Sequence, residues 1–194
     1  MTLDLKAADY TLSGLRPFPV AVTTAHEGRT NGLMSLSGGS GGIIPEAPRV
    51  TISLTKYNLT HDLVLASGVF AMHLLAASPD DAFDRSLKIL MGLGGSSGRD
   101  GDKLAQFDTK PGETGSPILL DALSYVEGRV VGTLDAEENT IFLADVVAAE
   151  RLCEGERLRI GEAWSKLPRE WLEKYEHNHG PQLESARRNR GLVD

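Results

Sequence analysis

One short segment brings together the groups that a phosphate ester requires. Lys56 supplies a cation, and Asn58 and Thr60 supply amide and hydroxyl donors where a helix is predicted to begin. Free N–H groups at a helix N-terminus favour a bound anion, and a charged donor forms stronger hydrogen bonds to phosphate. Asn and Thr are also common helix caps. Spacing alone therefore leaves two interpretations open, an anion site and a simple cap.

Three hydroxyl groups precede this segment, at Ser35, Ser37 and Ser40. They lie on a predicted strand end and on the glycine-rich loop 38–42. Because glycine has no Cβ, such a loop lets a ligand approach the backbone closely. The same composition is also typical of an ordinary flexible loop. A ligand site with small donors and a loop without a site are both compatible with this pattern.

The chain lacks the motifs of several common catalytic and metal sites. It has no Gly-Lys dipeptide for a P-loop, no G-x-G-x-x-G, no H-E-x-x-H and no G-x-S-x-G. His177 and His179 form a close pair on a polar tail, but a metal site would need further ligands, and a solvated tail is the favoured interpretation. The single cysteine, Cys153, excludes an internal disulfide and a cysteine cluster. We therefore predict no catalytic side chain and no metal site.

Composition narrows the class of protein. The 194 residues are 41% hydrophobic and 24% charged, which is typical of a globular domain. The formal net charge of −7 argues against a general nucleic-acid binder, which needs excess Lys and Arg to face phosphates. No apolar run is long enough to span a membrane, and the first residues do not resemble a signal peptide. We expect a cytoplasmic protein without nucleic-acid or membrane partners.

Hydrophobic patterning predicts mainly strands. The predicted strands are 19–25, 33–37, 50–55, 69–75, 123–134 and 140–150. Short helices are expected from Asn58 to 67 and from Pro79 to about Met91, and the polar stretch 92–117 is expected to be a surface excursion. Because most strands are consecutive, an antiparallel barrel or sandwich is favoured over a parallel sheet.

The C-terminal segment differs from the rest of the chain. Residues 162–194 contain both tryptophans, Trp164 and Trp171, and show helical spacing over 168–176. We expect one domain over residues 1–161 and a helical tail over 162–194. This tail either packs on the domain or on a partner subunit, or it acts as a lid over a site.

The ordered set of segments resembles a known family. The segments that carry the resemblance are 19–24, 31–37, 48–55, 60–63 (Thr-His-Asp-Leu), 66–75, 115–131 and 139–147. Over about residues 15–152 the chain resembles the flavin reductase-like family of the FMN-binding split barrel.

The resemblance implies a fold and a site. The fold would be mainly β with short helices, a Greek-key split β-barrel that forms a homodimer with FMN near the subunit interface. Ser37 and Ser40 would contact the flavin with Ser35 nearby. The phosphate would be held by Lys56, Asn58 and Thr60, with Tyr57 flanking them.

The resemblance also implies a reaction. The protein would be an oxidoreductase of the flavin reductase type, which takes hydride from NADH or NADPH onto FMN. Electrons would pass on to free flavin, a partner oxygenase or a small acceptor. Since the flavin carries the chemistry, no acid–base pair of side chains is needed. The alternative is a non-catalytic split-barrel protein that binds flavin or heme, and a change of ligand to a deazaflavin is also open.

Overall fold

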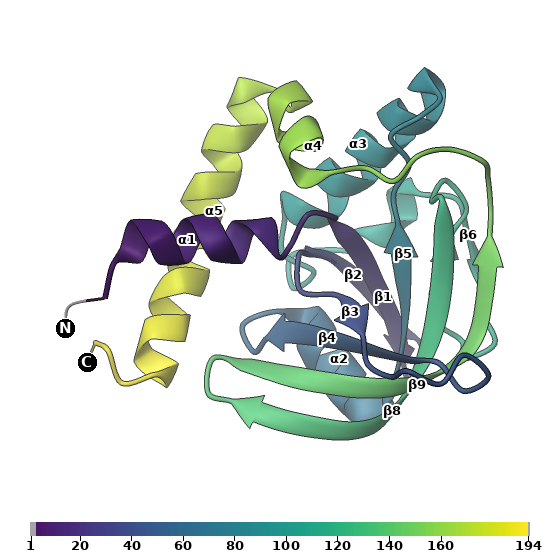
Figure 1. Ribbon diagram of the computed structural model, residues 1–194, viewed down its shortest axis with the longest axis horizontal. Coiled ribbons are helices and arrows are strands. Elements are labelled where there is room, and N and C mark those ends of the chain that lie inside the picture. Colours follow the sequence, from purple (N-terminus) through teal and green to yellow (C-terminus); the bar gives the residue numbers. More distant parts are fainter. Residues whose placement is uncertain (1–2, 194) are drawn as a thin grey trace.

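The computed structural model, which describes residues 3–193, is organised around one curled antiparallel sheet (Figure 1). Seven strands pair in the order β2-β1-β5-β8-β9-β4-β3. Their bounds are β1 Val20–His26, β2 Arg29–Ser35, β3 Gly39–Ser40, β4 Arg49–Thr55, β5 Val69–Leu74, β8 Ser124–Ala136 and β9 Asn139–Arg151. The expectation of a mainly β fold is confirmed.

Strand β4 shows how the sequence pattern becomes one face of the core. Val50, Ile52 and Leu54 are buried, while the residues between them are only half-buried. Successive side chains of a strand point to opposite faces, so this alternation gives one apolar face and one polar face. The apolar face packs with Phe70 of β5 and Phe142 of β9. The polar face is therefore left available to line a site.

The long β8–β9 hairpin bends the sheet. These two strands pair over most of their length, and the pairing register shifts between Glu127 and Gly128 and again between Val130 and Gly132. Irregularities of this kind bend a strand and increase its twist. Since β8 pairs with β5 and β9 pairs with β4, the bent hairpin connects the two halves of the sheet.

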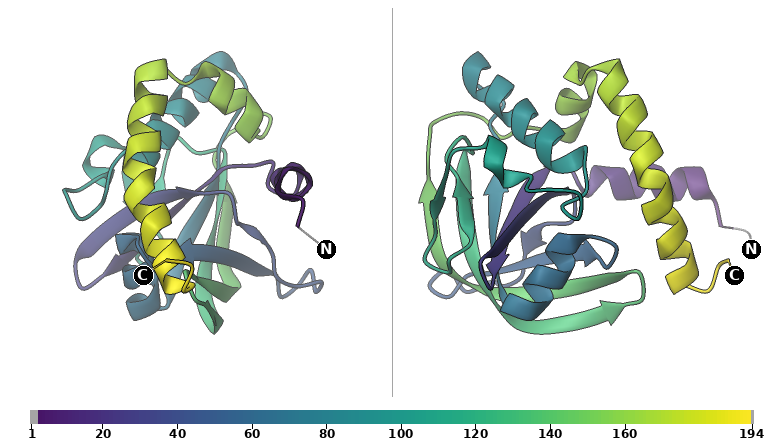
Figure 2. Two further views of the ribbon diagram at one scale, coloured as in Figure 1. Left: turned by 90° about the vertical axis from the view of Figure 1, so that its left-hand side faces the viewer. Right: turned by 180° about the vertical axis from the view of Figure 1, so that it is seen from behind.

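Five α-helices flank the sheet within residues 3–193. They are α1 Leu5–Gly14, α2 Leu59–Ser67, α3 Asp80–Gly94, α4 Ile160–Lys166 and α5 Arg169–Asn189. Helix α1 projects away from the sheet, and none of its residues is buried (Figure 1). Helix α5 runs along one side of the molecule (Figure 2). None of these helices is long and apolar enough to cross a lipid bilayer.

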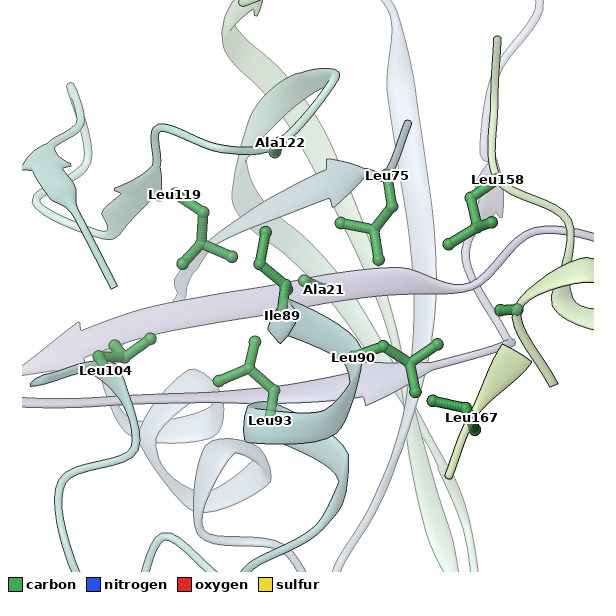
Figure 3. Packing of buried hydrophobic residues seen from close by; sticks show 11 residues of the cluster. Ala21, Leu75, Ile89, Leu90, Leu93, Leu104, Leu119, Ala122, Leu158 and Leu167 are labelled. Carbon is green, nitrogen blue, oxygen red and sulfur yellow. The ribbon is translucent and has the colours of Figure 1, made fainter. Parts of the chain in front are cut away.

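Helix α3 fastens the C-terminal region to the sheet. Its residues Ile89, Leu90 and Leu93 point into a cluster that includes Ala21 of β1 (Figure 3). Leu167, which follows α4, joins the same cluster. This shared core holds the start of α5 next to the end of α3.

Two parts of the chain differ from the sequence expectation. No element was predicted where α1 forms. The stretch 92–117, expected at the surface, contains the buried Leu104 and the strand β6 Thr109–Pro111, which pairs with β7 Pro117–Leu119. Isolated apolar residues in a polar stretch give no periodic signal. Their burial depends on packing partners that are distant in the sequence, so the local pattern does not predict it.

The buried side chain of His73 ties β7 to the sheet. The backbone N–H of Leu119 donates to Nε2 of His73 across 3.1 Å, and Nδ1 of His73 lies 3.2 Å from the carbonyl of Ala21. These contacts fit a neutral imidazole that donates from Nδ1 and accepts at Nε2. Burial lowers the pKa of His73 to about 4. His73 is therefore a structural residue of the core.

Candidate functional site

Two adjoining cavities lie between the sheet and α5. The smaller, the β2–β4 cavity, has a volume of about 300 Å³ and is lined by the ends of β2 and β4. The larger, the α2 cavity, has a volume of about 520 Å³ and is lined by the segment that leads into α2. The two share five wall residues: Met34, Gly94, Tyr175, His179 and Gln182. Together they form one groove that α5 borders.

The β2–β4 cavity contains two of the predicted serines. The hydroxyl oxygens of Ser35 and Ser37 lie 2.7 Å apart, and the Ser37 hydroxyl donates to the carbonyl of Ser53 across 2.6 Å. These bonds fix both hydroxyl groups where the chain leaves β2. Met34 and Leu36 add apolar surface to the same wall. The wall thus combines polar groups with an apolar surface, as small-molecule sites usually do.

The structure adds polar residues that the prediction of site residues missed. Ser53 and Thr55 line the β2–β4 cavity from the polar face of β4. Asn139 joins them because it pairs with Thr55 at the start of β9. The alternation of β4 could have indicated the first two residues, since it places them opposite the core. Only the strand pairing could have indicated Asn139.

The α2 cavity contains Tyr57 and Asn58. Asn58 occupies the N-cap position of α2, with extended backbone angles, yet its side chain makes no capping hydrogen bond. The simple-cap interpretation of Asn58 is therefore not what the structure shows. Its amide group remains available to hydrogen-bond a molecule in the cavity.

Lys56 lies beside this region and does not line either cavity. Its Nζ donates to Oδ1 of Asp135, near the end of β8, across 2.7 Å. This hydrogen bond holds the pKa of Asp135 below its usual value. Since the Asp135 side chain is 71% exposed, the pair is a surface ion pair, and such pairs contribute little to stability. Lys56 can therefore exchange this partner for another anion at low cost.

Two further residues of the predicted set, like Lys56, do not line the cavities. The Ser40 hydroxyl is exposed and donates to the carbonyl of Gly42 across 3.1 Å. The Thr60 side chain is fully buried, and its hydroxyl accepts a hydrogen bond from Nδ2 of Asn31. The structure thus brings Ser35 and Ser37 together in one cavity and Tyr57 and Asn58 in the other.

The segment Thr60-His-Asp-Leu, which carried much of the resemblance, fastens α2 in place. The Nε2 of His61 lies 2.9 Å from the Thr140 hydroxyl, and Nδ1 lies 3.0 Å from Asp62. Asp62 also accepts from Arg99 across 2.7 Å. Partial burial raises the pKa of Asp62, but the hydrogen bonds from His61 and Arg99 outweigh it, so the pKa lies below its usual value. These side chains position the helix start that faces the α2 cavity.

The histidine pair of the tail lies on α5. His177 lines the α2 cavity, and His179 lines both cavities. Among residues 3–193, no group of three or more His, Cys, Asp or Glu side chains is placed to hold a metal ion.

The groove suits an elongated ligand with one apolar, polar-edged part and one anionic part. The volumes of the cavities fall within the range of small-molecule sites, roughly 300–1,000 Å³. The β2–β4 cavity offers hydroxyl groups and apolar surface. The α2 cavity offers the free Asn58 amide at a helix N-terminus, where anions are favoured. A planar ring bearing a phosphate ester fits this distribution of groups.

The sequence matches one protein-family model, and it is also similar to curated proteins. The model of the flavin reductase like domain matches residues 14–158. The chain is 34% identical over 115 residues to the high molecular weight rubredoxin of Moorella thermoacetica. That match covers 59% of this chain and 48% of the rubredoxin, so the chain spans about half the length of this relative.

Solved structures share the architecture. An FMN-binding protein from Thermus thermophilus superposes with a TM-score of 0.61 at 24% identity, over 70% of this chain and 71% of that one. The NADH:FAD oxidoreductase SgcE6 of Streptomyces globisporus superposes with a TM-score of 0.60 at 23% identity, over 82% and 90% of the two chains. At such low identities these likenesses show a common fold alone.

Proposed function

The chain belongs to the flavin reductase like domain family, and from this premise we propose that it binds FMN and passes hydride from NADH or NADPH to an acceptor. One observation carries the proposal: two serines of the predicted flavin side, Ser35 and Ser37, and two residues of the predicted phosphate side, Tyr57 and Asn58, line adjoining cavities that share one wall. Flavin, when bound, supplies the hydride chemistry, while the protein supplies binding and orientation.

The β2–β4 cavity is the proposed site of the ring. Ser35 and Ser37, joined to the backbone of Ser53, offer fixed polar groups to the ring edge. Met34 and Leu36 offer an apolar surface to its face. Since the hydroxyl groups are already held by hydrogen bonds, little conformational entropy is lost when a ligand binds to them.

The α2 cavity and its rim are the proposed site of the phosphate. Asn58 hydrogen-bonds the phosphate through its side-chain amide, which makes no capping hydrogen bond to the helix. Tyr57 lines the cavity beside it. Lys56 turns from Asp135 to the phosphate, because an exposed ion pair holds it only weakly. Thr60 contributes its backbone N–H, which belongs to the first turn of α2, since its hydroxyl is bound to Asn31. Ser40 remains a prediction.

The proposal extends to assembly and partners. We propose that the curled sheet is a Greek-key split β-barrel in a homodimer, with residues 1–161 as the flavin-binding unit and 162–194 as an appended tail. The exposed Tyr10, Leu12 and Leu15 at and after α1 supply apolar surface for such an interface. The proposed acceptors are free flavin, a partner oxygenase or a small molecule, and the proposed location is the cytoplasm.

A titration followed by a reduction assay tests the function. Purified protein is titrated with FMN, and the visible flavin absorption of the complex is followed under anaerobic addition of NADH and then NADPH. We expect saturable FMN binding and bleaching by at least one of the two donors. FMN binding without bleaching by either donor would make the chain a flavin-binding protein rather than a reductase. Absence of FMN binding would overturn the site, and a Soret band would indicate heme.

A further inference from the structure

Helix α5 carries an aromatic column. Trp171, Tyr175 and His179 recur every fourth residue, so they lie on one face of the helix. The rings of Trp171 and Tyr175 stack with centroids 5.2 Å apart, and those of Tyr175 and His179 stack at 5.7 Å. Trp164 of α4 meets the Tyr175 ring edge-on at 5.6 Å. We call Trp171, Tyr175 and His179 the α5 aromatic column.

Both ends of α5 are attached to the body of the protein. Near its start, Nε1 of Trp171 donates to the carbonyl of Met91 in α3 across 3.2 Å. Just after its end, the Arg190 guanidinium lies 3.7 Å from the carboxylate of Glu138 in the β8–β9 turn. Figure 2 shows the helix extending along this side of the molecule. Between these attachments α5 borders the groove.

All three members of the column line the β2–β4 cavity, which is the proposed site of the flavin ring, and two of them also line the α2 cavity. Tyr175 and His179 line both the β2–β4 cavity and the α2 cavity. Tyr175 is half-buried, and burial raises the pKa of its hydroxyl. All of α5 lies beyond residues 14–158, the part that the family model matches. The outer wall of the groove is therefore built by a segment outside the family domain.

We propose that Tyr175 and His179 form the outer wall of the flavin site and slow the dissociation of FMN. The inference rests on the proposed function. The sheet side of the groove provides Met34 and Leu36, and the α5 side provides aromatic rings. A planar heterocycle placed between them contacts side chains on both sides, and aromatic contacts stabilise it beyond simple burial. FMN then stays bound through turnover, and the electron acceptor is the molecule that exchanges.

The test measures the rate of FMN dissociation by stopped flow on full-length protein. We expect Tyr175→Ala and His179→Ala each to release FMN roughly tenfold faster than wild type. Tyr175→Phe keeps the ring and should release FMN at the wild-type rate. The matched control is Glu176→Ala, since Glu176 lies on the same helix, is exposed and lines neither cavity.

The variant His179→Ala still tests the proposal if Tyr175→Ala loosens α5. The His179 side chain is exposed, so its truncation leaves the helix docked, which circular dichroism verifies. Riboflavin, which lacks the phosphate, is the second probe and should show the same acceleration as FMN. An acceleration with FMN but not riboflavin would place the column at the phosphate and overturn the ring contact.

The outcomes separate the two proposals. If wild type binds FMN, and Tyr175→Ala and His179→Ala release it at the rate of the control Glu176→Ala, the proposed role of α5 is overturned. The proposed function then stands. If wild type does not bind FMN at all, the proposed function itself fails.

Discussion

Asn31 Nδ2 donates a hydrogen bond to Oγ1 of Thr60 across 3.0 Å, and both side chains are buried. Thr60 therefore serves the packing of α2 against β2 through its side chain. We expect Thr60→Val to lower the free energy of unfolding by roughly 1–3 kcal/mol, because it leaves the Asn31 amide without an acceptor. FMN affinity should change little, since Thr60 lines neither cavity and its hydroxyl is bound to Asn31. Urea denaturation and FMN titration measure the two effects.

Asn58→Ala is the matched contrast to Thr60→Val. The Asn58 side chain makes no capping hydrogen bond, so its removal should leave the free energy of unfolding nearly unchanged. The same removal should weaken FMN binding. Equal effects of the two variants on FMN affinity would contradict this division of roles.

The ion pair between Lys56 and Asp135 predicts that replacing each partner by alanine affects FMN affinity differently. We expect Lys56→Ala to weaken FMN binding by on the order of tenfold, because a charge-assisted contact to the phosphate is lost. Asp135→Ala removes the competing carboxylate, so FMN binding should be unchanged or tighter. Titrations at low and high salt provide the measurement, and the salt dependence should decrease in Lys56→Ala. Weaker binding in Asp135→Ala would show that Lys56 does not turn to the phosphate.

The buried His73 predicts acid sensitivity of the fold. Its pKa is lowered from 6.5 to about 4 by burial, so between these pH values the unfolded chain binds a proton that the folded chain excludes. The free energy of unfolding should therefore fall as pH drops below 6.5, with a slope approaching about 1.4 kcal/mol per pH unit. Urea denaturation at several values from roughly pH 7.5 down to about pH 4.5 measures this slope.

A variant without the titrating group isolates this contribution. His73→Gln should be less stable at neutral pH, because two buried hydrogen bonds are disturbed, yet its stability should depend less on pH over the same range. An unchanged slope in His73→Gln would assign the acid sensitivity to other groups.

Gly95 lies directly against Trp171 of α5. A Cβ at this position would lie 2.6 Å from Nε1 of Trp171 and 2.8 Å from the carbonyl of Met91. The backbone φ of Gly95 is −87°, which alanine adopts readily, so any effect of Gly95→Ala is steric. We expect this variant to displace Trp171 and to shift tryptophan emission to the red. Gly101→Ala, where the added Cβ meets nothing within 4 Å, is the control.

This measurement is specific because the chain has only two tryptophans and both belong to the aromatic cluster of α4 and α5. Identical emission from Gly95→Ala and Gly101→Ala would show that α5 tolerates the extra methyl group without moving.

Local pattern predicted the elements that local forces decide. The alternation of Val50, Ile52 and Leu54 predicted β4 and its buried face, because strand periodicity follows directly from backbone geometry. The ordered segments predicted the family, and the small donors at Ser37 and Asn58 led to the walls of both cavities. The sequence by itself thus determined the mainly β fold, the family and the approximate place of the site.

Tertiary structure decided which donors are available. Thr60 and Asn58 look alike as helix-start donors, but only packing against Asn31 turns the Thr60 hydroxyl inward. Lys56 meets Asp135, which lies 79 positions later, through the pairing of β4 with β9 and of β9 with β8. Tyr175 reaches the groove because α3 and α4 share a core that holds the start of α5 in place. Contacts of this kind depend on strand register and helix packing between distant segments, which residue spacing does not encode.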